Sequence, residues 1–177
     1  ARTLGTGLGS AFIQDRQALE PSEQTPYTGI LYKLPFRDGI AEDYISSRWI
    51  VNEYASLTGE KTEAKEVAAR ALNGDENAKK IYECLGRNLA EILAPHIRSF
   101  NADGLVIGGN IALAHPLFLP AFHIVLQEKN IDTPVVISVD TEVSAMIGAA
   151  HYLKSTRQQC MNKAMETIDW RKCKQPL

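Results

Sequence analysis

The sequence predicts an α/β domain whose sheet contains parallel strands, and two observations support this fold class. The second half of the chain alternates short apolar segments with helical segments, in the order strand, helix, strand, helix. This order favours parallel strands, because each helix carries the chain back to the start of the next strand. A composition of 45% hydrophobic and 23% charged residues over 177 residues is typical of one globular core.

The chain begins with a glycine turn in the stretch LGTGLGSAFI, residues 4–13, and Ala11–Ile13 is a short apolar segment typical of a strand. Residues 20–29, EPSEQTPYTG, are typical of a loop because they are rich in Pro, Thr and Ser. We expect no strand ahead of the turn, since the chain reaches it almost at once. A start without methionine also suggests a piece cut from a longer protein.

Three helices are predicted in the middle of the chain. Apolar residues recur at nearly helical spacing from Ile40, and Gly59 is placed to end that helix. The stretch EAKEVAARALNG is a second helix, which its final Asn-Gly pair closes. Asp75 can cap a third helix, and we expect Pro95 to kink or end it near its last turn.

The second half then gives the strands and helices of the α/β pattern. DGLVIGGN is a buried strand that runs into a glycine pair, a helix follows through Phe118 to Lys129, and TPVVISVD is a second strand. TEVSAMIGAAHYL closes the pattern as a helix whose small residues allow close packing. We divide the chain into a domain of residues 1–154 and a helical tail of residues 155–177 that packs on it.

Charge, hydropathy and cysteines exclude several classes of protein. A net charge of -2 and a pI near 6.1 give no electrostatic case for nucleic acid or an anionic membrane. No apolar stretch approaches the roughly 20 residues of a membrane span, and no signal peptide is visible, so we expect a cytoplasmic protein. Cys84, Cys160 and Cys173 share no CxxC spacing, so they predict neither a disulfide framework nor a zinc cage.

Three phosphate-binding interpretations apply to Gly5-Thr6-Gly7-Leu8-Gly9. A P-loop needs Lys and then Ser or Thr after its last glycine, but Ser10 and Ala11 follow here. A dinucleotide fingerprint needs GxGxxG, a helix and a second strand, and this sequence has GxGxG followed by a loop. There remains a hairpin whose backbone N–H groups and Thr6 hydroxyl surround phosphate oxygens, with a plain hairpin as the alternative.

A second glycine pair, Gly108-Gly109, follows a buried strand about 100 residues later. Ligands of open α/β sheets bind at the carboxyl ends of strands, and a bare backbone lets a ligand approach closely. Two such positions indicate one elongated ligand.

These motifs together resemble the C-terminal domain of the ROK family, which comprises bacterial sugar kinases and sugar-responsive repressors. LGTGLGSAFI is similar to the family's second phosphate loop, LVIGGNIA to its adenosine motif and SAMIGAAHYL to its closing helix. EDYISSRWI is similar to the stretch that follows the family's sugar and zinc region. The likeness covers residues 4–153 and implies a three-layer actin-like ATPase (ribonuclease H-like) domain with a mixed sheet.

The resemblance implies a site for ATP with Mg²⁺. It assigns the nucleotide phosphates to Gly5, Thr6, Gly7 and Gly9, and the adenosine to Gly108, Gly109 and Asn110. The family's catalytic Asp belongs to a region that this chain does not contain, so the resemblance names no catalytic residue here.

The sequence departs from the family at the sugar and zinc motifs. The family's Glu-x-Gly-His motif holds sugar hydroxyls and, through its His, a structural zinc; Ile30, Tyr32 and Lys33 stand at its Glu, Gly and His. The cysteines that complete the zinc site should precede Glu42, but residues 37–41 hold none, so we expect no zinc. Glu42 is the one matched sugar ligand, with a solvated acid in the first turn of a helix as the alternative.

Two functions follow from the resemblance. The first is an ATP-dependent sugar kinase of which this chain is the nucleotide-binding half, and the alternative is a non-catalytic, sugar-responsive transcriptional regulator. We expect a homodimer through helices that carry Ile45 and Trp49, and nucleic acid as a partner only if a separate N-terminal DNA-binding domain exists. The four histidines have surface or core-edge positions in this interpretation, and Asp140 a capping role at the end of its strand.

Overall fold

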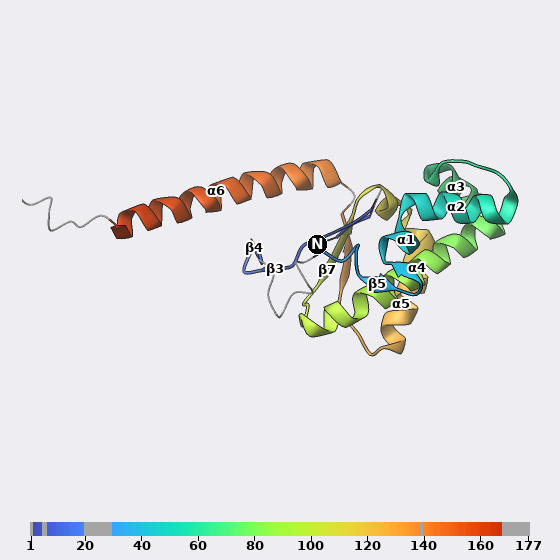
Figure 1. Ribbon diagram of the computed structural model, residues 1–177, viewed down its shortest axis with the longest axis horizontal. Helices are drawn as coiled ribbons and strands as arrows, with labels where there is room; N and C mark the ends of the chain where they lie inside the picture. The colour runs from blue at the N-terminus through green and yellow to red at the C-terminus, as the bar shows by residue number, and fades with distance from the viewer. Residues whose placement is uncertain (1, 5–6, 20–29, 139, 168–177) are drawn as a thin grey trace, which may run out of the picture. The chain divides into compact units, whose positions relative to one another are not determined.

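The computed structural model describes residues 2–4, 7–19, 30–138 and 140–167 (Figure 1). The predicted loop at residues 20–29 therefore lies outside the described residues. The chain divides into two compact units, residues 1–139 and residues 140–177. The first unit holds the sheet and the helices α1 to α5, and the second holds the helix α6.

Four strands form the main sheet, in the order β2-β1-β7-β8. They are β1 (Arg2–Leu4), β2 (Leu8–Ser10), β7 (Leu105–Gly108) and β8 (Val135–Ile137). The pair β1 and β2 is antiparallel, whereas β1 with β7 and β7 with β8 are parallel. The sheet is thus mixed, as the family resemblance implies.

The expectation that no strand precedes the glycine turn is wrong. Arg2 pairs with Ser10 of β2 on one side and with Ile107 of β7 on the other, so β1 is an inner strand of the sheet. Three residues suffice for this strand because neighbours on both sides supply hydrogen bonds to its backbone. Two small hairpins lie outside the sheet: β3 (Ile13–Gln14) with β4 (Gln17–Ala18), and β5 (Pro35–Phe36) with β6 (Gly39–Ile40).

The helix predicted from Ile40 is in fact two helices, α1 (Glu42–Ile45) and α2 (Ser47–Thr58). Ser46 between them is buried and extended, with φ -99° and ψ 163°, and its hydroxyl oxygen accepts a hydrogen bond from the Trp49 amide at 3.3 Å. A serine that caps a new helix in this way competes with continuation of the old one. Gly59 ends α2 in the left-handed region at φ 76°, as predicted.

The second and third predicted helices are α3 (Ala64–Leu72) and α4 (Glu76–Ser99). Asp75 caps α4 as predicted, because its Oδ1 accepts hydrogen bonds from the amides of Asn77 and Ala78 at 2.9 and 3.1 Å. Pro95 does not end the helix, which continues to Ser99. Residues 110–114 form a short 3-10 helix, η1 (Asn110–Ala114), that leads into α5 (His115–Glu128).

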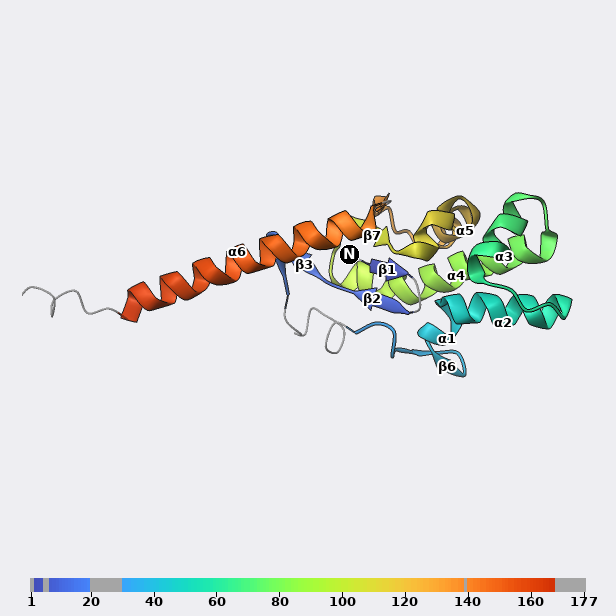
Figure 2. The ribbon, with the colours of Figure 1, turned by 90° about the horizontal axis from the view of Figure 1, so that it is seen from above.

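α4 lies at the centre of the helical part, and α1, α2, α3 and α5 all pack against it (Figure 2). Its closest neighbour is α5, at Gly86. A Cβ atom on Gly86 would lie 2.1 Å from the carbonyl oxygen of Phe118, so only glycine permits this approach. The rings of Phe118 and Phe122 are fully buried beside it.

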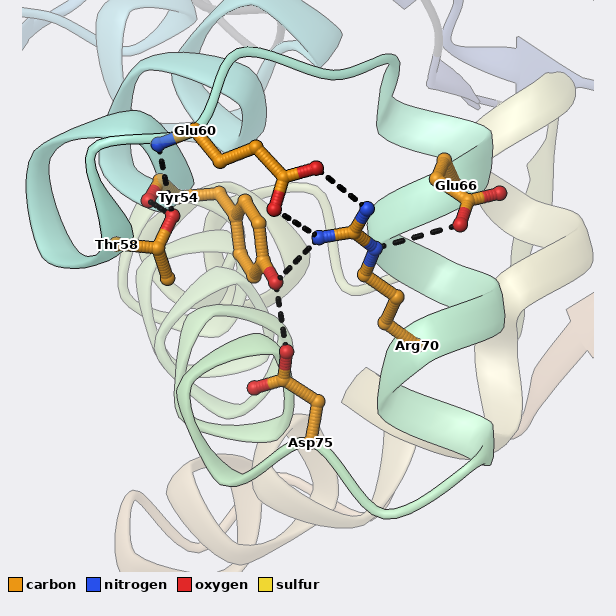
Figure 3. A network of polar contacts seen from close by, with 6 residues as sticks. All are labelled: Tyr54, Thr58, Glu60, Glu66, Arg70 and Asp75. Carbon is orange, nitrogen blue, oxygen red and sulfur yellow. Dashed lines mark hydrogen bonds and ion pairs between the residues drawn. The ribbon is translucent and has the colours of Figure 1, made fainter.

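Arg70 of α3 is linked to α2 and the loop after it by its guanidinium group, and to the start of α4 through Tyr54 (Figure 3). It donates two hydrogen bonds to the carboxylate of Glu60, at 2.6 and 2.7 Å, and one to the hydroxyl of Tyr54 at 2.9 Å. The Tyr54 hydroxyl in turn donates to Asp75 at 2.7 Å. This hydrogen bond holds the pKa of Asp75 below its usual value, and the Arg70 guanidinium does the same for the pKa of Glu60.

The second unit contains α6 (Thr141–Thr167), a single helix in which the predicted boundary between residues 154 and 155 has no break. Asp140 caps it, because its Oδ1 accepts a hydrogen bond from the Val143 amide at 3.2 Å. The capping role predicted for Asp140 is therefore found at the start of this helix. Packing of the tail on the domain stays a prediction, and residues 168–177 lie outside the described residues.

One stretch does reach membrane length, contrary to the sequence analysis. Among the described residues, Asn110–Glu128 is 19 residues long with a mean hydropathy of 1.3. Phe118, Phe122, Val125 and Leu126 of this stretch are buried in the core of the first unit. Part of its apolar character is thus explained by packing in the core, whereas Leu113 and Ile124 of the same stretch are exposed.

We expect Gly86→Ala to lower the free energy of unfolding by about 2 kcal/mol or more, because the new methyl group has to push α5 away from α4. Gly104→Ala is the matched control: its Cβ would meet the carbonyl oxygen of Pro134 at 3.8 Å, an ordinary contact. Its effect should stay within about 0.5 kcal/mol. Urea unfolding measures both, and equal stability of the two variants would contradict the close approach.

The Arg70 network predicts a dependence of stability on pH. Because the pKa of Asp75 is lowered from 3.8 in the folded state, its contribution is complete above that pH and is lost as pH falls through the lower folded value. Asp75→Asn keeps a cap residue but cannot titrate. We expect the urea midpoint to fall less steeply in Asp75→Asn than in the parent between about pH 4 and about pH 2. Parallel curves would refute this role of Asp75.

Candidate functional site

The two glycine motifs lie at the same edge of the sheet. β1 and β7 are neighbouring parallel strands, and Thr3 pairs with Gly108, so the chain leaves both strands on the same side. β1 is followed by the turn that leads to Gly7 and Gly9, and β7 is followed by Gly109. That these two bare backbones serve one elongated ligand stays a prediction.

The glycine turn after β1 is a hairpin, as the third phosphate-binding interpretation required. Leu4 pairs with Leu8 and Thr3 with Gly9, so the chain reverses direction instead of entering a helix. Gly5 and Thr6, two of the predicted phosphate contacts, lie outside the described residues. Of the other two, Gly7 is half-buried and Gly9 is exposed on β2.

The turn after β7 depends on Gly109. Its φ of 97° and ψ of 171° lie in a region that residues with a side chain rarely adopt. Its carbonyl oxygen accepts a hydrogen bond from the Ala112 amide at 3.0 Å, which starts η1. Gly108 is buried at the end of the strand, and Asn110 is exposed in the first position of η1. η1 contacts both β1 and β7, so this turn is held against the strand that precedes the hairpin.

Glu42 lies against the glycine hairpin. A Cβ atom on Gly7 would lie 2.8 Å from Oε2 and 3.2 Å from Oε1 of Glu42, so the carboxylate occupies the space where a side chain at residue 7 would be. Glu42 is half-buried as the first residue of α1, and its amide donates a hydrogen bond to the Tyr32 carbonyl oxygen at 3.1 Å. The predicted phosphate turn and the predicted sugar ligand are therefore in contact.

The residues at the diverged sugar motif lie on the chain just before α1. Ile30 and Lys33 are exposed, and Tyr32 is half-buried. The ammonium group of Lys33 lies 5.7 Å from the centre of the Tyr32 ring. None of these three side chains carries a carboxylate or an imidazole, the groups that the family's motif uses for sugar hydroxyls and zinc.

The segment that should carry zinc-binding cysteines forms the β5–β6 hairpin instead. Residues 37–41 contribute one cation and one carboxylate there. No group of three or more His, Cys, Asp or Glu residues able to hold a metal occurs in the described part of the chain. Four-coordinate zinc needs thiolate or imidazole donors, and a guanidinium repels a metal cation. The residues present therefore do not fit a zinc ion.

The histidines and Cys84 lie at half-buried or exposed positions. His96 and His115 are half-buried, and His123 and His151 are exposed. Cys84 is half-buried on α4, and burial raises the pKa of its thiol. The side chain of Cys160 and all of Cys173 lie outside the described residues.

A polar cluster next to α1 was missed by the sequence analysis. Arg37 lies in the turn of the β5–β6 hairpin and donates a hydrogen bond to Oδ1 of Asn88 at 2.7 Å, while Asn88 is fully buried on α4. The Tyr44 hydroxyl donates to Asp38, which lowers the pKa of Asp38 and raises that of Tyr44. The available signal was Asn88 itself, a polar residue among the apolar positions of a predicted helix.

Two hollows in the described part of the chain lie elsewhere. One of about 260 Å³ is lined by residues that include Phe12, Phe100 and Leu105, at the opposite edge of the sheet from the glycine turns. The other, of about 380 Å³, lies between α4 and α5 and is lined by residues that include Arg87 and Pro120. Neither is lined by Glu42 or by the glycines of the two turns.

The sequence matches the ROK family over residues 36–156. No curated protein matches the chain. Among solved structures, the chain is similar to a ROK hexokinase from Thermus thermophilus, with 19% identity and a TM-score of 0.72 over 88% of this chain and 57% of that chain.

Two further structures are similar. A ROK family glucokinase from Streptomyces griseus in complex with glucose and AMPPNP has 20% identity and a TM-score of 0.63, over 77% of this chain and 54% of that chain. A ROK family transcriptional regulator, a homologue of the E. coli MLC protein, has 21% identity and a TM-score of 0.64, over 76% of this chain and 40% of that chain. At these identities the likeness shows a shared fold, and the chain spans little more than half of each kinase.

The contact between Gly7 and Glu42 can be tested by substitution. Gly7→Ala should displace the Glu42 carboxylate. The free energy of unfolding should change by less than about 1 kcal/mol, because the displaced group is the end of a flexible side chain. Gly39→Ala is the matched control, since its Cβ would meet the carboxylate of Asp43 at 2.9 Å instead. In carboxyl ¹³C NMR, the Glu42 signal should shift in Gly7→Ala only. A Glu42 signal that does not respond to Gly7→Ala contradicts the contact.

Proposed function

Because the chain belongs to the ROK family, we propose that it is the nucleotide-binding half of an ATP-dependent sugar kinase. In this proposal the phosphates of ATP contact the hairpin and the adenosine contacts the turn after β7. The residues assigned are Gly5, Thr6, Gly7 and Gly9 for the phosphates, and Gly108, Gly109 and Asn110 for the adenosine. The observation that carries the proposal is that both glycine turns leave neighbouring parallel strands at one edge of the sheet.

Glu42 is the proposed link between nucleotide and sugar. A carboxylate accepts hydrogen bonds from sugar hydroxyls, and this one lies against Gly7 of the phosphate hairpin. A hydroxyl held by Glu42 would lie beside the phosphate to be transferred, and such positioning is a large part of catalysis of phosphoryl transfer. In this proposal Mg²⁺ binds together with ATP and neutralises part of the charge of its phosphates.

The rest of the active site comes from outside these 177 residues in this proposal. The chain corresponds to 57% and 54% of the two kinases in length. The general base and the first phosphate loop of the family would belong to a second lobe that closes over the nucleotide. The actin-like, three-layer form of the domain is part of the same proposal. A third layer of this kind would cover the side chains of Val106 and Val136, which are exposed on the sheet.

The alternative function is a non-catalytic, sugar-responsive transcriptional regulator. It is favoured by Ile30 and Lys33, which stand where the family's kinases have sugar and zinc ligands. The complete open reading frame separates the two functions. A catalytic Asp ahead of the hairpin favours the kinase, and a helix-turn-helix ahead of the domain favours the regulator and brings nucleic acid in as a partner.

A cytoplasmic homodimer remains part of the proposal, but Ile45 is removed from the surface expected for self-association. Ile45 is fully buried in the chain's own core, and Trp49 is half-buried against that core. Ile45 is therefore unavailable to a second copy, and any dimer surface has to consist of other residues.

The nucleotide assignment can be tested by calorimetry on the 177-residue chain with AMPPNP. We expect weak binding, about 100-fold or more below that of a complete kinase, because one wall of the cleft is missing. Gly109→Val should abolish binding, since a side chain would occupy the adenosine face and the φ of 97° disfavours valine. Lys33→Ala is the control and should bind as the parent does.

Urea unfolding of Gly109→Val, run alongside, separates loss of the site from loss of the fold. If Gly109→Val is folded and binds AMPPNP with the parent's affinity, the nucleotide assignment is wrong. If the 177-residue chain phosphorylates glucose, the proposal that it holds only part of the active site is wrong. The complete gene product is then assayed for ATP-dependent phosphorylation of glucose and other hexoses, which tests the kinase function itself.

A further inference from the structure

Arg37 is held in one arrangement by contacts on several sides. Its backbone is in the left-handed region at φ 54°, within the turn between β5 and β6. Its guanidinium carbon lies 5.0 Å from the centre of the Phe36 ring and 5.3 Å from that of Tyr44, distances typical of cation–π contacts. Glu91 of α4 adds a longer ion pair at 3.8 Å.

The strongest of these contacts reaches the core. Arg37 donates to Oδ1 of Asn88 at 2.7 Å, and Asn88 has no exposed surface. Among the described residues, the other donor to this oxygen is the Cys84 thiol at 3.9 Å, which is a weak one. Loss of the partner of a buried carbonyl oxygen destabilises the folded protein. Asn88 therefore holds the Arg37 guanidinium, and through it the hairpin, to α4.

Asn88 also holds the end of α1. Its amide nitrogen donates to the Tyr44 carbonyl oxygen at 3.2 Å. The start of α1 is further joined to the chain just before the hairpin, because the Ala41 amide donates to the Leu34 carbonyl oxygen at 2.9 Å and the Glu42 amide donates to the Tyr32 carbonyl oxygen at 3.1 Å. Glu42 thus lies on a short segment that is attached to α4 at both of its ends, by Arg37 before it and by Tyr44 after it.

We propose that Arg37 is a positioning residue that fixes the segment bearing Glu42, and that this arginine cross-link replaces the metal cross-link that the ROK resemblance implies for the same segment. Its role toward sugar rests on the proposed function. Its role in holding the segment does not, because that role follows from the contacts of Arg37 and Asn88.

A cross-link of this kind explains why the segment needs no thiolates. Zinc joins distant parts of a chain through four donors, whereas a guanidinium joins them through several N–H groups and a flat face. Arg37 uses both: its N–H groups reach Asn88 and Glu91, and its face lies on two rings. Lysine lacks the flat face and the forked donors, so Arg37→Lys should restore the cross-link only in part.

Hydrogen exchange of the folded protein tests the cross-link without reference to function. In Arg37→Ala, the amides of Ala41 and Glu42 should exchange about tenfold faster or more, while amides in the middle of α4 keep their protection. Arg70→Ala is the matched control, because Arg70 also joins three elements but lies in the network around Tyr54 (Figure 3). It should speed exchange near Asn77 and leave Glu42 unchanged.

A chelator provides the second arm. Treatment of the parent with EDTA should leave exchange at Ala41 and Glu42 unchanged. Faster exchange there would mean that a metal holds the segment, and it would overturn the proposal. Unchanged exchange at Glu42 in Arg37→Ala would overturn it as well, since the segment would then be held by other contacts.

The sugar arm uses the complete gene product and glucose, with AMPPNP affinity as the internal reference. Arg37→Ala should weaken glucose binding about tenfold and leave AMPPNP binding unchanged, and Arg37→Lys should fall between. Arg70→Ala should change neither. If the parent binds AMPPNP but neither glucose nor any other hexose, the proposed kinase function fails, and the exchange results still decide the role of Arg37. If the parent binds glucose and Arg37→Ala binds it equally well, the positioning role toward sugar is wrong.

Discussion

The contact between α4 and α5 at Gly86 is the constraint on which the first unit depends. α4 is buried on most of its circumference, which is the pattern of a helix at the centre of a core. Because glycine lets α5 approach closely on one side, the other sides of α4 remain available to α1, α2 and α3. Residues along α4 then accept hydrogen bonds from the elements packed around it. Asp75 at its start accepts one from Tyr54, and Asn88 in its middle accepts one from Arg37.

The candidate site combines elements of two kinds. Its proposed nucleotide part is backbone at Gly7, Gly9 and Gly109, whose geometry is set by the strands of the sheet. Its proposed sugar part is one side chain, Glu42, whose position depends on a short hairpin and a four-residue helix. A side chain on so small a support needs attachment to the core, and α4 supplies it through Asn88.

The sequence was informative where one residue type had a local reason to be present. Gly59 and Asp75 were correctly predicted at helix ends, because an αL residue and an N-cap leave local signals. β1 was missed, because its partners lie in β2 and β7 and its own residues show no alternation over so short a length. The break at Ser46 and the link from Arg37 to Asn88 were missed for the same reason: each depends on contacts that only the folded chain creates.

The pairing of Arg2 with Ile107 has a consequence for the order in which the molecule folds. The helices α2, α3 and α4 are contiguous in the chain and can associate early, since closing a short loop loses little entropy. The pairing of β1 with β7 has to wait until the intervening hundred or so residues have been made and brought together. The edge that carries both glycine turns is therefore completed late, and a chain whose helices have already assembled still lacks the edge to which we assign the nucleotide.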